Sequence, residues 1–126
     1  MRRWILKFAS YKKPDDIFDA VVSGKKTIET RPRNPKSRRD YSNIKSGDIL
    51  VLKSLDSGRA IERIVLFNHT YDSVEEMVDE EDVEKILPGI GSKKSLLKVY
   101  EELKSRWGKT YAQKLETYGI VAIGID

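Results

Sequence analysis

The sequence predicts an α+β fold in which a small β-barrel is decorated by helices. Three patterns lead to this prediction: a helical segment follows the first strand, two long strands form a hairpin over residues 48–71, and further helical segments precede the last strand. The 126 residues are enough to bury one hydrophobic core without disulfides, so we expect a single domain spanning residues 1–126.

The first third of the chain contains two predicted strands and one helix. Residues 4–9 (WILKFA) have the pattern of a first strand. A proline and two aspartates begin a helical pattern over residues 14–23, which ends at Gly24. Residues 27–31 alternate in polarity and predict a second strand. The next residues, 32–43, hold two prolines and no apolar period, so we expect a long, exposed and mobile loop.

The middle of the chain predicts a hairpin of two long strands. Residues 48–55 follow a turn and are almost continuously apolar, so we expect this strand to be buried on both faces. An Asp-Ser-Gly turn at residues 56–58 leads into the second strand, over residues 59–71.

Helical segments and one strand complete the predicted fold. Ser73 and Glu76 form a capping box that begins a helix, and a second short helix is expected over residues 82–87. Ser92 begins the longest helix, and the final residues 117–126 form a β-rich run that needs partner strands on both sides. The longest helix places its large side chains on one face, which consists of Leu96, Leu97, Tyr100, Leu103 and Trp107.

The composition excludes several classes of site. The chain has no cysteine and one histidine, which excludes disulfides, thiol catalysis and Cys-rich or His-rich metal sites, so we expect no metal and no cofactor. We find no secretory signal pattern and no membrane-spanning run, and therefore expect a cytoplasmic protein. Charged residues make up 35% of the chain, and heavy use of Lys and Glu without Cys is a thermophile-like composition.

Charge is distributed unevenly along the chain. Residues 25–45 contain eight basic residues and two acids, whereas residues 72–84 contain eight acids and no base. The basic segment is either a solvated face or a surface for a polyanion such as nucleic acid. Tyr41 lies in this segment and is the aromatic residue that we expect to stack on a base. Acids in the first turns of short helices also complement the helix dipole, and the role of the acidic segment stays open.

A short motif, GKKTIETR, joins the first predicted helix to the second predicted strand. Because side chains alternate along a strand, Glu29 and Arg31 should point to one face together with Thr27. Lys26 comes just before the strand, at the rim of the expected site, where its ammonium can reach a phosphate or a base carbonyl. Arg31 offers a planar fork for a phosphate or a base edge.

Glu29 has two interpretations because it stands between two cations. In the first, it orients Lys26 or Arg31 through an ion pair. In the second, it accepts a hydrogen bond from a nucleobase amine or acts as a general base. The flanking cations should lower the pKa of Glu29, which suits an acceptor better than an acid.

With four further landmarks, the motif resembles the ASCH domain, a family in the PUA-like superfamily of small β-barrels linked to RNA. The motif residues are Gly24, Lys26, Glu29 and Arg31. The landmarks are the Gly-Asp turn at 47–48, the helix start at 72–77, the Leu-Pro-Gly stop at 87–89 and the strand at 118–123. The resemblance runs from about residue 4 to residue 126. It implies a groove between barrel and helices that the motif strand faces, and binding of RNA or a modified nucleoside there.

We therefore expect an RNA- or nucleotide-binding cleft walled by residues 24–31 and overhung by the loop at residues 32–43. The residues expected to bind the nucleic acid are Gly24, Lys26, Glu29, Arg31, Arg33, Arg38, Arg39 and Tyr41. The sequence does not specify the oligomeric state.

Two enzyme classes and one binding class are the alternatives. Small bacterial relatives are N4-acetylcytidine amidohydrolases that use a Lys, a Thr three residues later and a distal acid; Lys26 fits, but Glu29 occupies the Thr position and residues 87–89 lack the acid. Other relatives are proposed ribonucleases, for which Lys26, Arg31, Tyr41 and Ser42 are available. The third alternative is a structural or protein-binding module.

Three ring side chains outside the motif have structural roles in this interpretation. His69 shares a strand alternation with Phe67 and Tyr71, and a single strand histidine is more often a packing residue or a surface hydrogen-bond partner than a catalyst. We expect Trp4 and Trp107 to belong to the core.

Overall fold

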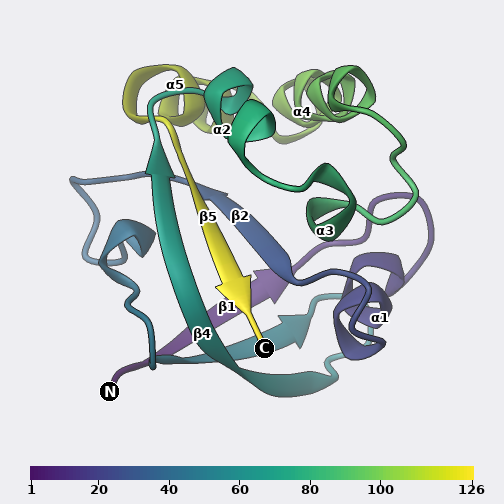
Figure 1. The fold of residues 1–126 in the computed structure, drawn as a ribbon, viewed down its shortest axis with the longest axis vertical. Coiled ribbons are helices and arrows are strands. Elements are labelled where there is room, and N and C mark those ends of the chain that lie inside the picture. Colours follow the sequence, from purple (N-terminus) through teal and green to yellow (C-terminus); the bar gives the residue numbers. More distant parts are fainter.

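The computed structural model describes the whole chain, residues 1–126, and contains one sheet with helices against both of its faces (Figure 1). The strands are β1 (Arg3–Phe8), β2 (Ile28–Pro32), β3 (Ile49–Ser54), β4 (Ala60–Tyr71) and β5 (Ile120–Ile125). The helices are α1 (Asp16–Val22), the short 3-10 helix η1 (Tyr41–Asn43), α2 (Val74–Glu80), α3 (Val83–Ile86), α4 (Lys93–Trp107) and α5 (Lys109–Tyr118). Helices α2 to α5 lie against one face of the sheet, and α1 is packed into the other.

The long strand β4 bends the sheet into a half-barrel. Its first part pairs with β3 and its last part with β5, and the register shifts between Val65 and Phe67, where the strand can bend. The strand order is β1-β3-β4-β5-β2, so β1 and β2 are the two edges of the curled sheet (Figure 1). The predicted α+β fold with a helix-decorated barrel is confirmed, as a half-barrel that is open between β1 and β2.

Two hydrophobic clusters lie on the two faces of this sheet. The cluster inside the half-barrel consists of Trp4, Leu6, Phe8, Phe18, Val21, Ile44, Leu50, Leu52, Val65, Val121, Ile123 and Ile125. The second cluster packs the sheet against α2, α3, α4 and α5, and includes Ile28, Met77, Leu96, Tyr100, Leu115 and Ile120. All six residues of β5 are buried, because β5 pairs with β2 on one side and β4 on the other, as its sequence predicts.

Side-chain caps begin the helices where the sequence predicts them. The Ser73 hydroxyl accepts from the Glu76 N–H, the Asp82 carboxylate from the Glu84 N–H, and the Ser92 hydroxyl from the Ser95 N–H. None of the helices combines the length and the apolar character needed to cross a membrane. The sequence did not predict α5, which follows α4 after the single residue Gly108.

Two burial predictions are wrong. The strand β3 is not buried on both faces: Leu50 and Leu52 point into the half-barrel, whereas Lys53 is exposed. The outer face of this part of the sheet meets solvent, as the exposed Ile64 on the neighbouring strand shows. Trp4 is buried, but Trp107 at the end of α4 is 48% exposed and does not belong to the core.

The loop at residues 32–43 is anchored at its end. Asp40 is buried and caps η1, and the Tyr41 ring packs edge-on against Trp4 with ring centroids 6.4 Å apart. The Asn68 amide donates to the carbonyls of Tyr41 and Ile44, at 2.9 Å each. The expected exposure therefore holds for Arg38 and Arg39 but not for Asp40. Its mobility stays a prediction.

Gly119, at the end of α5, is the glycine on which the packing of the last strand depends. Its φ is +83°, and a Cβ added there would lie 2.1 Å from the carbonyl oxygen of Tyr71 in β4. This oxygen belongs to the sheet backbone, so Gly119→Ala should lower the free energy of unfolding by about 3 kcal/mol. Chemical denaturation measures the loss.

Gly91→Ala is the matched control, because Gly91 has a φ of +84° and a Cβ there would meet nothing within 4 Å. It should lose only the cost of a left-handed backbone, about 1–2 kcal/mol. Equal losses in the two variants would show that the contact with Tyr71 does not matter.

Candidate functional site

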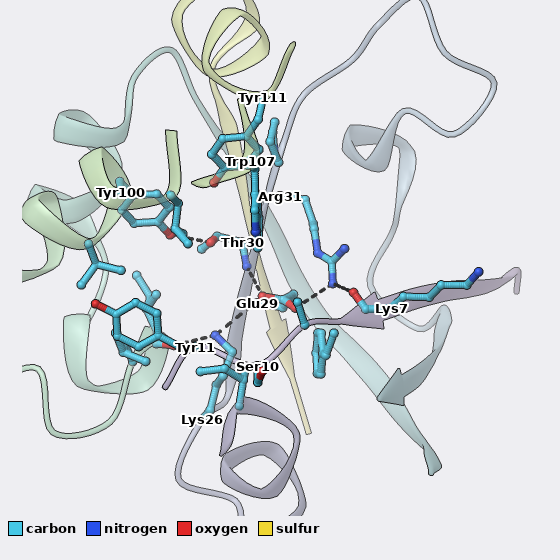
Figure 2. A pocket seen from close by; sticks show the side chains of 18 of the residues that line it. Lys7, Ser10, Tyr11, Lys26, Glu29, Thr30, Arg31, Tyr100, Trp107 and Tyr111 are labelled. Carbon is cyan, nitrogen blue, oxygen red and sulfur yellow. Dashed lines mark hydrogen bonds and ion pairs between the residues drawn. The ribbon is translucent and has the colours of Figure 1, made fainter. Parts of the chain in front are cut away.

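A cavity of about 350 Å³ opens at the seam between the two edge strands, where α3, α4 and α5 cover it (Figure 2). Of its 20 lining residues, 13 are hydrophobic. The lining comes from residues 7–11 within and after β1, from residues 29–32 of β2, and from the helices, together with Lys26, Leu55 and Leu87. The volume lies at the lower end of the range for ligand sites, about 300–1,000 Å³, and therefore fits one small ligand.

Lys26 lies on the cavity floor and ties two elements together. Its side chain is buried, and its ammonium donates to the Ile28 carbonyl of β2 at 2.6 Å and to the Ile86 carbonyl of α3 at 2.5 Å. The Nζ atom is also 3.7 Å from Oε1 of Glu29. Lys26 thus joins the motif strand to a helix that is 60 residues away in the chain.

Glu29 and Arg31 continue this network towards β1. Oε1 of Glu29 accepts from the Thr30 N–H at 2.8 Å, and Oε2 accepts from Nη2 of Arg31 at 3.1 Å. The same Nη2 donates to the Lys7 carbonyl of β1 at 2.7 Å, so Arg31 bridges the two edges of the sheet (Figure 2). We call these three side chains, Lys26, Glu29 and Arg31, the charged brace.

The charged brace binds two backbone groups on the free edge of β2. The Thr27 carbonyl and the Arg33 N–H both bond to the segment of β5, so the backbone groups of Ile28 and Thr30 point to the open seam. There Lys26 binds the Ile28 carbonyl and Glu29 binds the Thr30 N–H. Pro32 at the end of the strand has no N–H to satisfy. Part of this edge is thus paired without a further strand.

The electrostatics keep Glu29 ionised. Burial raises the pKa of Glu29, but Arg31, Lys26 and the Thr30 N–H lower it, and the net pKa lies below its usual value. This confirms the shift that the flanking cations predict. Burial lowers the pKa of Lys26, and Glu29 opposes this shift. The floor is thus a buried carboxylate between two cations.

Aromatic rings form the walls above this floor: Phe8, Tyr11, Tyr100, Trp107 and Tyr111. Trp107 and Tyr111 pack edge-on with ring centroids 4.9 Å apart, and the Tyr100 hydroxyl is hydrogen-bonded to the Thr30 hydroxyl. Burial raises the pKa of Tyr100 and of Tyr111, so both phenols stay neutral. Figure 2 shows Tyr11 and Tyr100 on one side of the charged brace and Lys7 on the other.

A family model of the ASCH domain matches residues 14–119. This chain belongs to the ASCH domain family. Its fold is similar to the crystal structure of the hypothetical protein PH0355, with a TM-score of 0.73, 27% identity, and coverage of 98% of this chain and 97% of the other. It is also similar to the solution NMR structure of protein PF0455 from Pyrococcus furiosus, with a TM-score of 0.63, 27% identity, and coverage of 98% and 96%. No curated protein matches the chain.

Three of the four ASCH motif residues come together at the cavity, with three differences from the sequence prediction. Lys26 lies at the floor and not at the rim, because its ammonium is drawn to two backbone carbonyls. Thr30 lines the cavity, whereas Thr27 does not. β2 is an edge strand, so its residues can reach the seam from the open side of the strand as well as from one face of the sheet. Gly24 has a φ of +80° in the turn after α1 and does not line the cavity.

The other four predicted binding residues lie outside the cavity of this ASCH domain. Arg33 follows β2, Arg38 and Arg39 are exposed in the loop, and Tyr41 packs on Trp4. Their contact with RNA stays a prediction. The residues that the sequence analysis missed are the aromatic walls, since a helical period shows that Tyr100 and Trp107 share a face but not that this face covers a cavity.

The residues named for the two hydrolase alternatives are only partly in the cavity. Glu29 is the one carboxylate among the lining residues, and Leu87 lines the wall where the distal acid of an amidohydrolase was sought. For a ribonuclease, Lys26 and Arg31 are present, but Tyr41 and Ser42 lie outside the lining, and the Ser42 hydroxyl donates to Asp40.

His69 is a surface hydrogen-bond partner, as its strand position predicts. Its Nδ1 lies 2.7 Å from Oε2 of Glu81, and its ring stacks on Phe67 with centroids 4.3 Å apart. It does not line the cavity.

The charged brace should be an energetically coupled unit. Glu29→Gln leaves Lys26 and Arg31 without their counter-charge, so the free energy of unfolding at neutral pH should fall by about 3 kcal/mol. Lys26→Met should also destabilise the protein, and the double variant should lose less than the sum of the two losses, by at least about 1 kcal/mol. Chemical denaturation of the four proteins gives this coupling.

Glu101→Gln is the control, because Glu101 pairs with Lys104 at 3.1 Å on the exposed surface of α4. It should leave the denaturation midpoint unchanged, since exposed ion pairs contribute little. Additive losses at Lys26 and Glu29 would contradict a coupled brace.

Proposed function

We propose that this ASCH domain binds RNA or a nucleotide and takes one nucleobase into the cavity. The observation that carries the proposal is a buried, ionised carboxylate between two cations at the floor of an aromatic-walled cavity. Aromatic rings stack on any base, and each stacked base contributes about 1–3 kcal/mol to binding.

The floor offers both an acceptor and donors to the edge of a base. A carboxylate can accept about four hydrogen bonds. Within the chain, each oxygen of Glu29 accepts one, so each has a lone pair left for an N–H of the ligand. Arg31 makes both of its bonds through Nη2, which leaves Nε and Nη1 to donate to a ring nitrogen or carbonyl. This pairing of acceptor and donor suits the edge of a nucleobase.

The same floor disfavours a phosphate. Glu29 would repel an anion inside the cavity, and Lys26 already donates to two backbone carbonyls. We therefore place the base inside and the ribose and phosphate towards the mouth. For a longer RNA, the exposed Arg38 and Arg39 are then available to contact the backbone away from the cavity.

Nucleoside titrations test the base site. By calorimetry, the protein should bind at least one of the four ribonucleosides or N4-acetylcytidine saturably. Tyr111→Ala removes a wall of the cavity and should weaken this binding about tenfold, because a stacking surface is lost. Tyr118→Ala is the matched control, since Tyr118 is a partly buried tyrosine of the same helix that does not line the cavity.

Three results would contradict this function. The first is no saturable binding of any nucleoside, and the second is equal weakening by Tyr111→Ala and Tyr118→Ala. The third is release of cytidine from N4-acetylcytidine, measured chromatographically, which would favour the hydrolase alternative. We expect N4-acetylcytidine to remain intact, because Glu29 is the one carboxylate at the cavity.

The loop cations are tested by the salt dependence of RNA binding. Affinity for a single-stranded RNA should fall with salt, with a logarithmic slope of about 0.7 per neutralised phosphate. Arg38→Ala combined with Arg39→Ala should reduce this slope by roughly 1 to 2 and weaken all sequences alike. If this double variant binds RNA as the parent does, the basic loop is a solvated surface.

A further inference from the structure

We propose that the phosphate of the nucleotide held in the cavity binds two cations, Lys12 and Arg106, that contact the ring of Tyr11 at the cavity mouth. We call these three residues the Tyr11 rim. The proposal rests on the proposed function, since it concerns the phosphate of a ligand whose base occupies the cavity. It assigns the first phosphate to side chains outside both the ASCH motif and the basic loop.

The Tyr11 rim joins a wall of the cavity to two positive charges. Tyr11 lines the cavity, Nζ of Lys12 lies 5.5 Å from its ring centroid, and Cζ of Arg106 lies 5.4 Å from it. Both cations are exposed to solvent. In this proposal, a base that stacks within the aromatic walls brings its ribose and phosphate towards these two charges, which lie against a lining residue.

The backbone of the Tyr11 rim is held in place before any ligand arrives. The Asp16 carboxylate accepts from the N–H groups of Tyr11 at 2.8 Å, Lys12 at 2.7 Å and Lys13 at 3.2 Å. From the other side, Nη1 of Arg106 donates to the Tyr11 carbonyl at 3.2 Å. Two separate helices thus fix the same turn, which lowers the ordering cost of binding.

The rim keeps donors free for an anion. Arg106 uses one bond to Tyr11, so Nε and Nη2 remain, and a guanidinium binds phosphate through paired N–H groups. The ammonium of Lys12 makes no hydrogen bond or ion pair within the chain. Two carboxylates also lie beside the rim: Asp16 holds backbone N–H groups, and Glu102 accepts from the Tyr11 hydroxyl at 2.8 Å. Their donors are neutral, so both carboxylates keep their charge, and the proposal depends on the free donors of Lys12 and Arg106.

The other cations are placed less well for this phosphate. Like Lys12 and Arg106, the cations of residues 33–45 do not line the cavity, but none of them lies over a lining ring as the two rim cations do. Lys7 lines the opposite side, and its side chain points away from Tyr11 (Figure 2). The two brace cations are engaged at the floor, beside Glu29.

The test compares nucleosides with nucleotides. The four ribonucleosides and their 5′- and 3′-monophosphates are titrated by calorimetry at low salt against the parent and the double variant Lys12→Gln/Arg106→Gln. In the parent, one monophosphate should bind at least about tenfold more tightly than its nucleoside, as expected for charge-assisted hydrogen bonds. In the double variant the ratio of nucleotide affinity to nucleoside affinity should fall to about twofold or less.

Two further variants make the test specific. Lys94→Gln/Lys98→Gln removes two exposed cations of the same helix α4 and should keep the full preference. Lys12→Gln/Arg106→Lys retains a charge at position 106 and should keep more of the phosphate preference than Lys12→Gln/Arg106→Gln.

The possible failures are distinguishable. Absence of binding by every nucleoside and nucleotide would overturn the proposed function and this inference together. Nucleoside binding with no phosphate preference, or with a preference that survives in Lys12→Gln/Arg106→Gln, would overturn the inference alone. So would an equal loss of nucleoside and nucleotide affinity, which would show that Arg106 only supports Tyr11. Loss of the preference in Lys7→Gln or in Arg38→Ala/Arg39→Ala would assign the phosphate to those residues instead.

Discussion

The hydrogen bond from Arg31 to the Lys7 carbonyl joins the two edges of a sheet that does not close. A half-barrel leaves one row of backbone groups unpaired on each edge strand, and such groups are costly when they are removed from water. Here the charged brace binds two groups on the free side of β2 and links this strand to β1 and α3. Side chains thus connect the two edges in place of a sixth strand, and the space beside them stays open as a cavity.

The hydrogen bonds of the charged brace give a reason for burying three charged residues at the seam. Burying an ion pair costs desolvation, and apolar residues of similar size often give equal or higher stability. Apolar residues would close the seam, however, and would leave the Ile28 carbonyl and the Thr30 N–H without partners. The charges of Lys26, Glu29 and Arg31 satisfy these groups and still present an acceptor and donors to a ligand. In our proposal, the side chains that link the edge strands also form hydrogen bonds with the base.

Two separate groups of cations enter the proposal, one in the loop at residues 32–43 and one beside Tyr11. The basic loop that stands out in the sequence lies apart from the cavity, and its Arg38 and Arg39 face solvent. The cations of the Tyr11 rim come from the turn before α1 and from the end of α4, and neither position stands out in a charge profile. We therefore propose that the rim cations bind the first phosphate of a bound nucleotide, and that the loop cations contact the backbone of a longer RNA.

The sequence by itself determined the features that depend on local periodicity. It predicted the strand that puts Glu29 and Arg31 at one site, the helix starts at Ser73 and Ser92, the hairpin and the family. Tertiary structure alone decided that Lys26 turns to the carbonyl of Ile86, that Thr30 lines the cavity, and that Tyr11 and Tyr100 form its walls. These outcomes depend on contacts between segments about 60 to 90 residues apart. Local patterns specify which face of an element is apolar, whereas the packing of the whole chain decides what that face covers.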